Sequence, residues 1–109
     1  MTSNITLEKI FNKLQDRFNA DAAQGLNKVF QFSLNDADSF YLMIDNGQLQ
    51  SHWGEHNDPN ITLRMGEATF IGIISGDIDG MGAFMKGQLK AEGDVILATK
   101  LGQLFKRTA

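Results

Sequence analysis

The sequence predicts a two-layer α+β domain in which helices cover one face of a five-stranded sheet. Near both ends of the chain, apolar residues recur at three- and four-residue steps, which is typical of amphipathic helices. Between these ends, short segments alternate apolar and polar residues, which is typical of strands with one buried and one solvated face. The apolar face of such a sheet has to be covered by helices.

The first helix is predicted from an apolar stripe near the start of the chain. Its members are Leu7, Ile10, Phe11, Leu14 and Phe18. A short helical turn is expected over 19–25, ending at Gly25.

A β-hairpin is predicted around Asn46-Gly47, because this pair is the strongest short signal for a two-residue type I′ turn. With these two residues as the loop, Phe40 faces Trp53 across the hairpin. The apolar side of each strand then meets the apolar side of its partner, and a one-residue slip would destroy that match.

The other strands and helices follow from the same patterns. Further strands are expected at 27–34, 60–66 and 87–93. A short helix is expected at 67–76, and a final helix after Asp94, which is a suitable N-cap.

Length and composition limit the class of protein. The chain of 109 residues is expected to form one domain, 1–109, and its 42% hydrophobic and 21% charged residues are typical of a soluble globular protein. A net charge of −3 argues against nucleic acid as a partner, and the lack of cysteine excludes disulfides and thiolate chemistry. With no membrane-length apolar run and no secretory leader, a cytoplasmic location is expected.

His52, Glu55 and His56 suggest a metal site, but their spacing argues against one. In an extended segment the two histidines would lie about 13 Å apart, too far to share an ion. The segment 77–82, DIDGMG, opens like a calcium loop, yet Gln88 stands where the ion needs a bidentate Glu. We therefore interpret 77–82 as a Gly-rich connection and expect no metal.

The motifs of common enzyme classes are missing from the sequence. It contains no dinucleotide fingerprint, no phosphate-binding loop and no Gly-x-Ser-x-Gly nucleophile elbow. No catalytic residues, no cofactor and no enzymatic activity are therefore expected.

Lys9, Lys13 and Arg17 form a basic stripe along the first helix. The common interpretation is a solvated helix face. The alternative is a transient contact with an anionic membrane, to which Lys106 and Arg107 would add.

The final helix carries more apolar residues than the stripe of roughly 100° that a helix in a two-layer domain requires. Its apolar residues are Val95, Ile96, Leu97, Ala98, Leu101, Leu104 and Phe105. Composition alone leaves two interpretations open: ordinary core, or the wall of a cavity.

Residues 83–105 hold the most specific pattern in the chain, Phe-Met-x-Gly-x-Leu-x-x-x-Gly-Asp followed by a helix. The segments VFQFSL, DNGQL, ITLRM and SGDID precede it in that order. In these motifs, the chain from Leu26 to Phe105 resembles the sterol carrier protein 2 (SCP2) family of non-specific lipid-transfer domains.

This resemblance implies an apolar tunnel between the sheet and its helices, without catalytic residues. The implied ligand is a sterol, a fatty acid, a fatty acyl-CoA or a similar lipid. The candidate ligand-binding residues are Phe70, Ile71, Ile74, Phe84, Met85, Leu89, Leu97, Leu101, Leu104 and Phe105. The glycines of 76–87 are expected to let the segment around Phe84 move and admit the ligand.

Two functions are therefore considered. The first is an intracellular lipid carrier. The alternative is an interaction or accessory module, either a homodimer or the partner of an enzyme in lipid or quinone metabolism, without transfer activity of its own.

Overall fold

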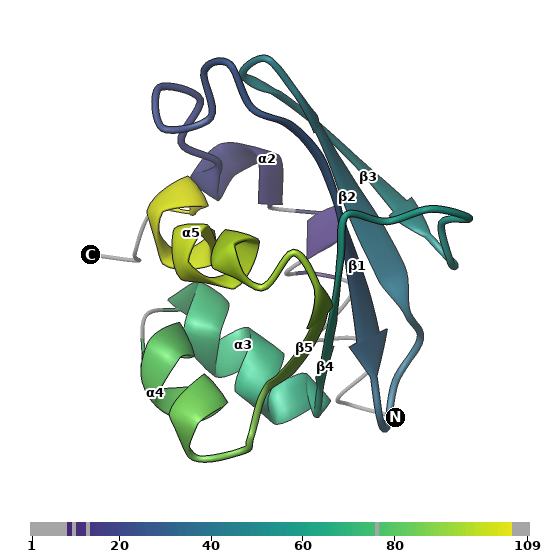
Figure 1. The fold of residues 1–109 in the computed structure, drawn as a ribbon, viewed down its shortest axis with the longest axis vertical. Coiled ribbons are helices and arrows are strands. Elements are labelled where there is room, and N and C mark those ends of the chain that lie inside the picture. The colour runs from purple at the N-terminus through teal and green to yellow at the C-terminus, as the bar shows by residue number, and fades with distance from the viewer. Residues whose placement is uncertain (1–8, 10, 13, 76, 106–109) are drawn as a thin grey trace.

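The computed structural model describes residues 9, 11–12, 14–75 and 77–105, which form a five-stranded mixed sheet with helices on one face (Figure 1). The strands are β1 (Asn27–Leu34), β2 (Phe40–Asp45), β3 (Gln48–Trp53), β4 (Ile61–Met65) and β5 (Lys90–Gly93). The helices are α2 (Leu14–Arg17), α3 (Glu67–Ser75), α4 (Gly80–Met85) and α5 (Ile96–Leu104). The predicted α+β class and two-layer arrangement are confirmed.

The sheet has the order β3-β2-β1-β4-β5. The central strands β1 and β4 are parallel, and every other neighbouring pair is antiparallel. The hairpin β2–β3 therefore occupies one edge of the sheet, and the short strand β5 occupies the other. No described helix is long and apolar enough to span a membrane.

The predicted hairpin register is confirmed. Phe40 pairs with Trp53, and Asp45 pairs with Gln48. Asn46 has φ 48° and Gly47 has φ 88°, so both loop residues adopt the left-handed conformation that a type I′ turn requires.

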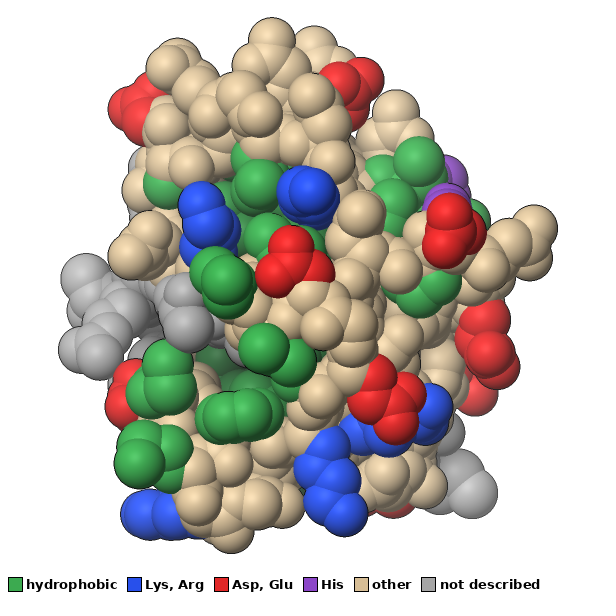
Figure 2. All heavy atoms as spheres, viewed as in Figure 1, with side chains coloured by type: hydrophobic (Ala, Val, Ile, Leu, Met, Phe, Trp, Pro, Cys, Tyr) green, Lys and Arg blue, Asp and Glu red, His purple; other side chains and the backbone are tan. Residues whose placement is uncertain are grey.

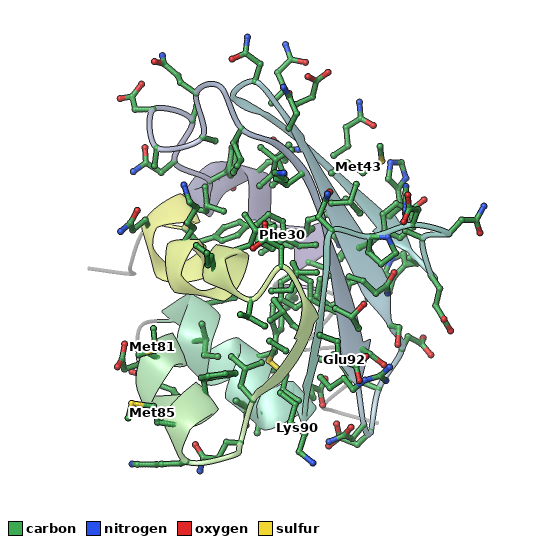
Figure 3. All side chains as sticks on the ribbon, viewed as in Figure 1. Phe30, Met43, Met81, Met85, Lys90 and Glu92 are labelled. Atoms are coloured by element: carbon green, nitrogen blue, oxygen red, sulfur yellow. The ribbon has the colours of Figure 1, made fainter. Side chains whose placement is uncertain are left out.

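The core lies between the sheet and the helices, and three phenylalanine rings mark its centre. Phe32 of β1 and Phe40 of β2 stack with their ring centroids 5.0 Å apart. Phe70 of α3 meets them edge-on at 5.3 and 5.1 Å. Figure 3 shows Phe30 pointing from the sheet towards the helices, while Met43 stands on the opposite face. The alternation predicted from the sequence thus decides which side chains the helices cover.

Helix α4 corrects the interpretation of 77–82 as a connection, because the helix begins within that segment. Glycine costs about 1 kcal/mol relative to alanine inside a helix, so Gly80 and Gly82 do not indicate one. The structure supplies the missing support. The Asp79 carboxylate accepts a hydrogen bond from the Gly82 N–H at 3.0 Å, and Ala83 is buried.

Two other boundaries differ from the prediction. The last strand begins at Lys90, so Leu89 lies just before it. The side chain of Asp94 does not cap α5, whose N-cap residue is Val95 without a side-chain bond. Instead, the backbone of Asp94 donates to the Asn60 carbonyl and accepts from the Leu97 N–H. The turn is therefore held by the main chain.

Candidate functional site

Most of the candidate ligand-binding residues meet in the layer between the sheet and helices α3 and α5. Phe70, Ile74, Leu89, Leu97, Leu104 and Phe105 are all buried there, and Ile71 is half-buried against them. They come from α3, from α5 and from the segment before β5. Residues far apart in the sequence thus form one continuous apolar layer.

Phe84 and Met85 lie elsewhere. Their side chains are 41% and 79% exposed, and Figure 3 shows Met85, with Met81 one turn before it, pointing away from the sheet. The side chain of Leu101 lies outside the described part of the structure. The candidate residues therefore divide into a buried group and an exposed pair on α4.

The C-terminal end of α5 is tied to the end of α2. Asn19 donates its N–H to the Leu104 carbonyl at 2.7 Å, and Phe18 forms a β-bridge with Phe105. The rings of Phe18 and Phe105 lie 6.0 Å apart. This end of the apolar layer is closed by main-chain and aromatic contacts.

Two hollows on the described surface are lined by a mixture of polar and apolar residues. One is lined by Ala37, Asp38, Ser39, Trp53, Gly54 and Glu55. The other lies beside α4 and is lined by Asp77, Ile78, Asp79, Gly82, Ala83, Lys86 and Gln88. Both include charged side chains, unlike the predominantly apolar wall of a typical pocket for a hydrocarbon chain. The apolar layer between the sheet and helices α3 and α5 is therefore a separate region from both hollows.

Two buried polar residues were missed by the sequence reasoning, because each follows an ordinary strand or helix pattern. Gln31 of β1 donates to the carbonyls of Phe40 and Gly54, and its Oε1 accepts from the His56 N–H. Glu67, the first residue of α3, is 4% exposed, and its Oε2 has no hydrogen-bond partner in the described structure. Gln31 fixes the chain after β3.

The described residues hold no group of three His, Asp or Glu side chains placed to bind a metal ion. His52 and His56 instead flank the ring of Tyr41, with centroids 5.3 and 5.1 Å from it. Lys9 of the predicted basic stripe is exposed. Lys13, Lys106, Arg107 and the side chain of Arg17 lie outside the described part, so the stripe remains a prediction.

The architecture and the sequence together identify the family. The sequence profile of the SCP-2 sterol transfer family matches residues 7–106. This chain belongs to that family. The match covers every strand and helix that the structure describes in this SCP-2 domain, including the apolar layer.

Relatives place SCP-2 domains inside longer proteins. The peroxisomal multifunctional enzyme A of Dictyostelium discoideum is 30% identical over 105 residues, which are 90% of this chain and 24% of that enzyme. This SCP-2 domain thus spans about a quarter of the length of that relative.

Solved structures share the fold. The SCP2L2 protein of Aedes aegypti, solved in palmitated form, superimposes with a TM-score of 0.70 at 18% identity and covers 94% of both chains. The sec-alkylsulfatase Pisa1 from Pseudomonas sp. gives a TM-score of 0.81 at 22% identity, over 92% of this chain and 16% of the enzyme. The SCP-2 fold therefore occurs both in small proteins and as part of a large enzyme.

Proposed function

We propose that this SCP-2 domain is a lipid carrier that binds a sterol, a fatty acid or a fatty acyl-CoA between the sheet and helices α3 and α5. The observation that carries the proposal is the continuous apolar layer formed by Phe70, Ile74, Leu89, Leu97 and Leu104. Family membership and the palmitated relative support it.

The chemistry of this layer predicts broad ligand selectivity. Transfer of a 16-carbon chain from water releases about 0.8 kcal/mol per methylene, or on the order of 10 kcal/mol in all. Ordering the ligand removes several kcal/mol of this, which leaves affinities of roughly micromolar to nanomolar. Because burial of apolar surface has no directional preference, chains that differ by one methylene bind with similar affinity.

We propose that the ligand enters where α4 moves away from the apolar layer. Gly87, with φ 80°, follows α4, and a methyl group on it would meet no atom within 4 Å. Hydrogen exchange tests this proposal. Amides of 77–87 should exchange faster than those of β1 and β2, and equal protection would show that the entrance lies elsewhere.

Binding itself is tested with a fluorescent fatty acid, displaced by palmitate, and with native mass spectrometry of the purified protein. Saturating fatty acid should raise the free energy of unfolding by about 2.7 kcal/mol at 100 times the Kd. If the purified protein carries no lipid and does not bind fatty acid in either assay, the carrier function is contradicted.

A matched pair of variants locates the ligand. Ile71 and Met43 are both half-buried, but Ile71 packs against the apolar layer and Met43 lies on the opposite face of the sheet. Ile71→Asp should weaken fatty-acid binding by about tenfold or more, because burying a carboxylate against the hydrocarbon chain of the ligand costs free energy. Met43→Asp should leave it unchanged. Equal effects would place the ligand outside the proposed layer.

The alternative is an interaction or accessory module without transfer activity. It is favoured by the relative in which the matching domain is 24% of a multifunctional enzyme. Native mass spectrometry separates the two functions, because this alternative expects a lipid-free dimer or a complex with another protein.

A further inference from the structure

We propose that the exposed apolar side chains of α4 and the start of α5 dock onto the surface of an anionic lipid bilayer. These side chains, named the α4–α5 patch, belong to Met81, Phe84, Met85, Val95 and Ile96. The proposal extends the carrier function, since a carrier must collect its ligand from a membrane, but it concerns a different surface and is tested separately.

Among the described residues, five of the six large hydrophobic side chains that are strongly exposed belong to this patch. Met85 is 79% exposed and Ile96 is 68% exposed, whereas the other three side chains are between 41% and 46% exposed. Trp53 is the other large hydrophobic residue of comparable exposure, and its ring stacks on Phe11 at 4.2 Å. Figure 2 shows hydrophobic side chains at the lower left, over α4, and others above them towards the start of α5.

The geometry of α4 directs these side chains outwards together. Met81, Phe84 and Met85 are spaced at i, i+3 and i+4, so they share one helix face. The opposite side of α4 is anchored, because Ala83 is buried and its carbonyl accepts from the N–H groups of Gln88 and Leu89. Helices α4 and α5 contact each other, and Val95 and Ile96 stand at the start of α5.

Charged side chains of both signs lie near the α4–α5 patch. Lys86 follows Met85 directly, Lys100 lies one turn beyond Ile96, and Lys90 begins β5; all three are exposed. Of the acidic side chains nearby, Glu92 is paired with Arg64 at 3.1 Å and Asp79 caps α4, while Asp77 and Asp94 are exposed.

The opposite edge of the sheet is acidic. Residues 37–56, which include strands β2 and β3, contain three acidic residues and no lysine or arginine: Asp38, Asp45 and Glu55. Because the sheet order separates β3 from β5, the acidic edge lies away from the patch. Near an anionic surface, this asymmetry turns the α4–α5 patch towards the headgroups.

A bilayer fits the patch better than a protein does. Apolar side chains that project beside lysines insert into the boundary between headgroups and acyl chains, where the ammonium groups meet lipid phosphate. Two of the five side chains are methionines, which are flexible and adapt to a fluid surface more readily than to one fixed partner.

Vesicle flotation tests the proposal, using phosphatidylcholine vesicles with and without phosphatidylglycerol. The wild-type protein should float with the anionic vesicles. The variant Met81→Ser/Met85→Ser/Ile96→Ser should lower the partition coefficient by about tenfold or more, because its substitutions remove the most accessible apolar surface. Lys86→Gln/Lys90→Gln/Lys100→Gln should lower it by about fivefold per lysine, on anionic vesicles only.

Two control variants sharpen the result. Met43→Ser removes a methionine from the opposite sheet face, and Lys9→Gln removes an exposed lysine of the first helix. Both should float as the wild type does. If Lys9→Gln lowers flotation and the α4–α5 variants do not, the basic stripe of the first helix is the membrane contact and the proposal is overturned.

Other outcomes are equally decisive. If native mass spectrometry finds a dimer that the triple serine variant dissociates, a second copy of the chain covers the patch and the proposal fails. Wild-type protein that binds fatty acid but never floats also overturns it. Protein that floats through the patch but binds no fatty acid in solution would support the docking surface and contradict the carrier function.

Discussion

Ile78, in the connection between α3 and α4, packs directly on Gly72 of α3. A Cβ atom on Gly72 would lie 2.4 Å from Cδ1 of Ile78 and 3.2 Å from its Cβ. The Ile78 N–H also donates to the Gly72 carbonyl at 3.0 Å. In this structure the contact packs the connection before α4 against α3, and α4 carries Met81, Phe84 and Met85 of the α4–α5 patch.

Gly72→Ala should destabilise the protein by about 1–3 kcal/mol, because Ile78 would have to move while its backbone remains hydrogen-bonded. Urea unfolding measures the change. Gly80→Ala is the matched control, since its Cβ would meet only Ile73 at an ordinary distance of 3.9 Å. That variant should be as stable as the wild type or slightly more so. Equal losses in both variants would contradict the proposed contact.

Gly93→Ala should be the more damaging of two substitutions at positive φ. Gly93 has φ 99°, and its Cβ would lie 2.6 Å from the Asn60 carbonyl oxygen, which belongs to the main chain and cannot rotate away. We expect a loss of more than about 3 kcal/mol in thermal or urea unfolding.

Gly87→Ala provides the comparison for Gly93→Ala. Gly87 has φ 80°, but the methyl group of an alanine there would meet no atom within 4 Å, so only the backbone strain of about 1–2 kcal/mol applies. If the two variants unfold at the same urea concentration, the clash with Asn60 does not contribute.

Gln31→Leu should cost about 1–3 kcal/mol, because the buried Phe40 carbonyl and the part-buried backbone groups of Gly54 and His56 lose their partner. NMR chemical shifts of Gly54 and His56 should change as well. Gln50→Leu, at an exposed position of β3, is the control and should change stability little. A stable Gln31→Leu variant would show that water replaces the lost hydrogen bonds.

The Arg64–Glu92 ion pair should contribute little to stability. Its atoms lie 3.1 Å apart, but the two side chains are 48% and 63% exposed. A double-mutant cycle with Arg64→Gln and Glu92→Gln should give a coupling energy within about 0.5 kcal/mol, and added salt should reduce it. A larger coupling that resists salt would mean that solvent screens this pair less than its exposure indicates.

The hairpin shows how much of this fold local sequence determines. Asn46 and Gly47 accept the positive φ values of the turn, and the alternation on both sides leaves one register that buries the apolar face. Turn and alternation agree, so both strands and their pairing could be predicted without knowing the rest of the molecule.

Helix α4 shows the opposite case. Gly80 and Gly82 have weak helix propensity, and the helix is supported by the Asp79 cap, by the burial of Ala83 and by the packing of Ile78 on Gly72. Residues 77–85 alone do not reveal the contacts with α3, which is why their sequence predicts a connection over 77–82.

By itself, the sequence determined the strands, the hairpin register and the family, because these depend on local periodicity, turn geometry and ordered motifs. Tertiary structure alone decided the parallel pairing of β1 with β4, and which apolar residues near the C-terminus are covered. Leu97 is buried while its neighbour Ile96 is exposed, although both are apolar residues of the same predicted helix. The physical reason is that burial depends on which neighbouring element covers a side chain, and that neighbour comes from a distant part of the chain.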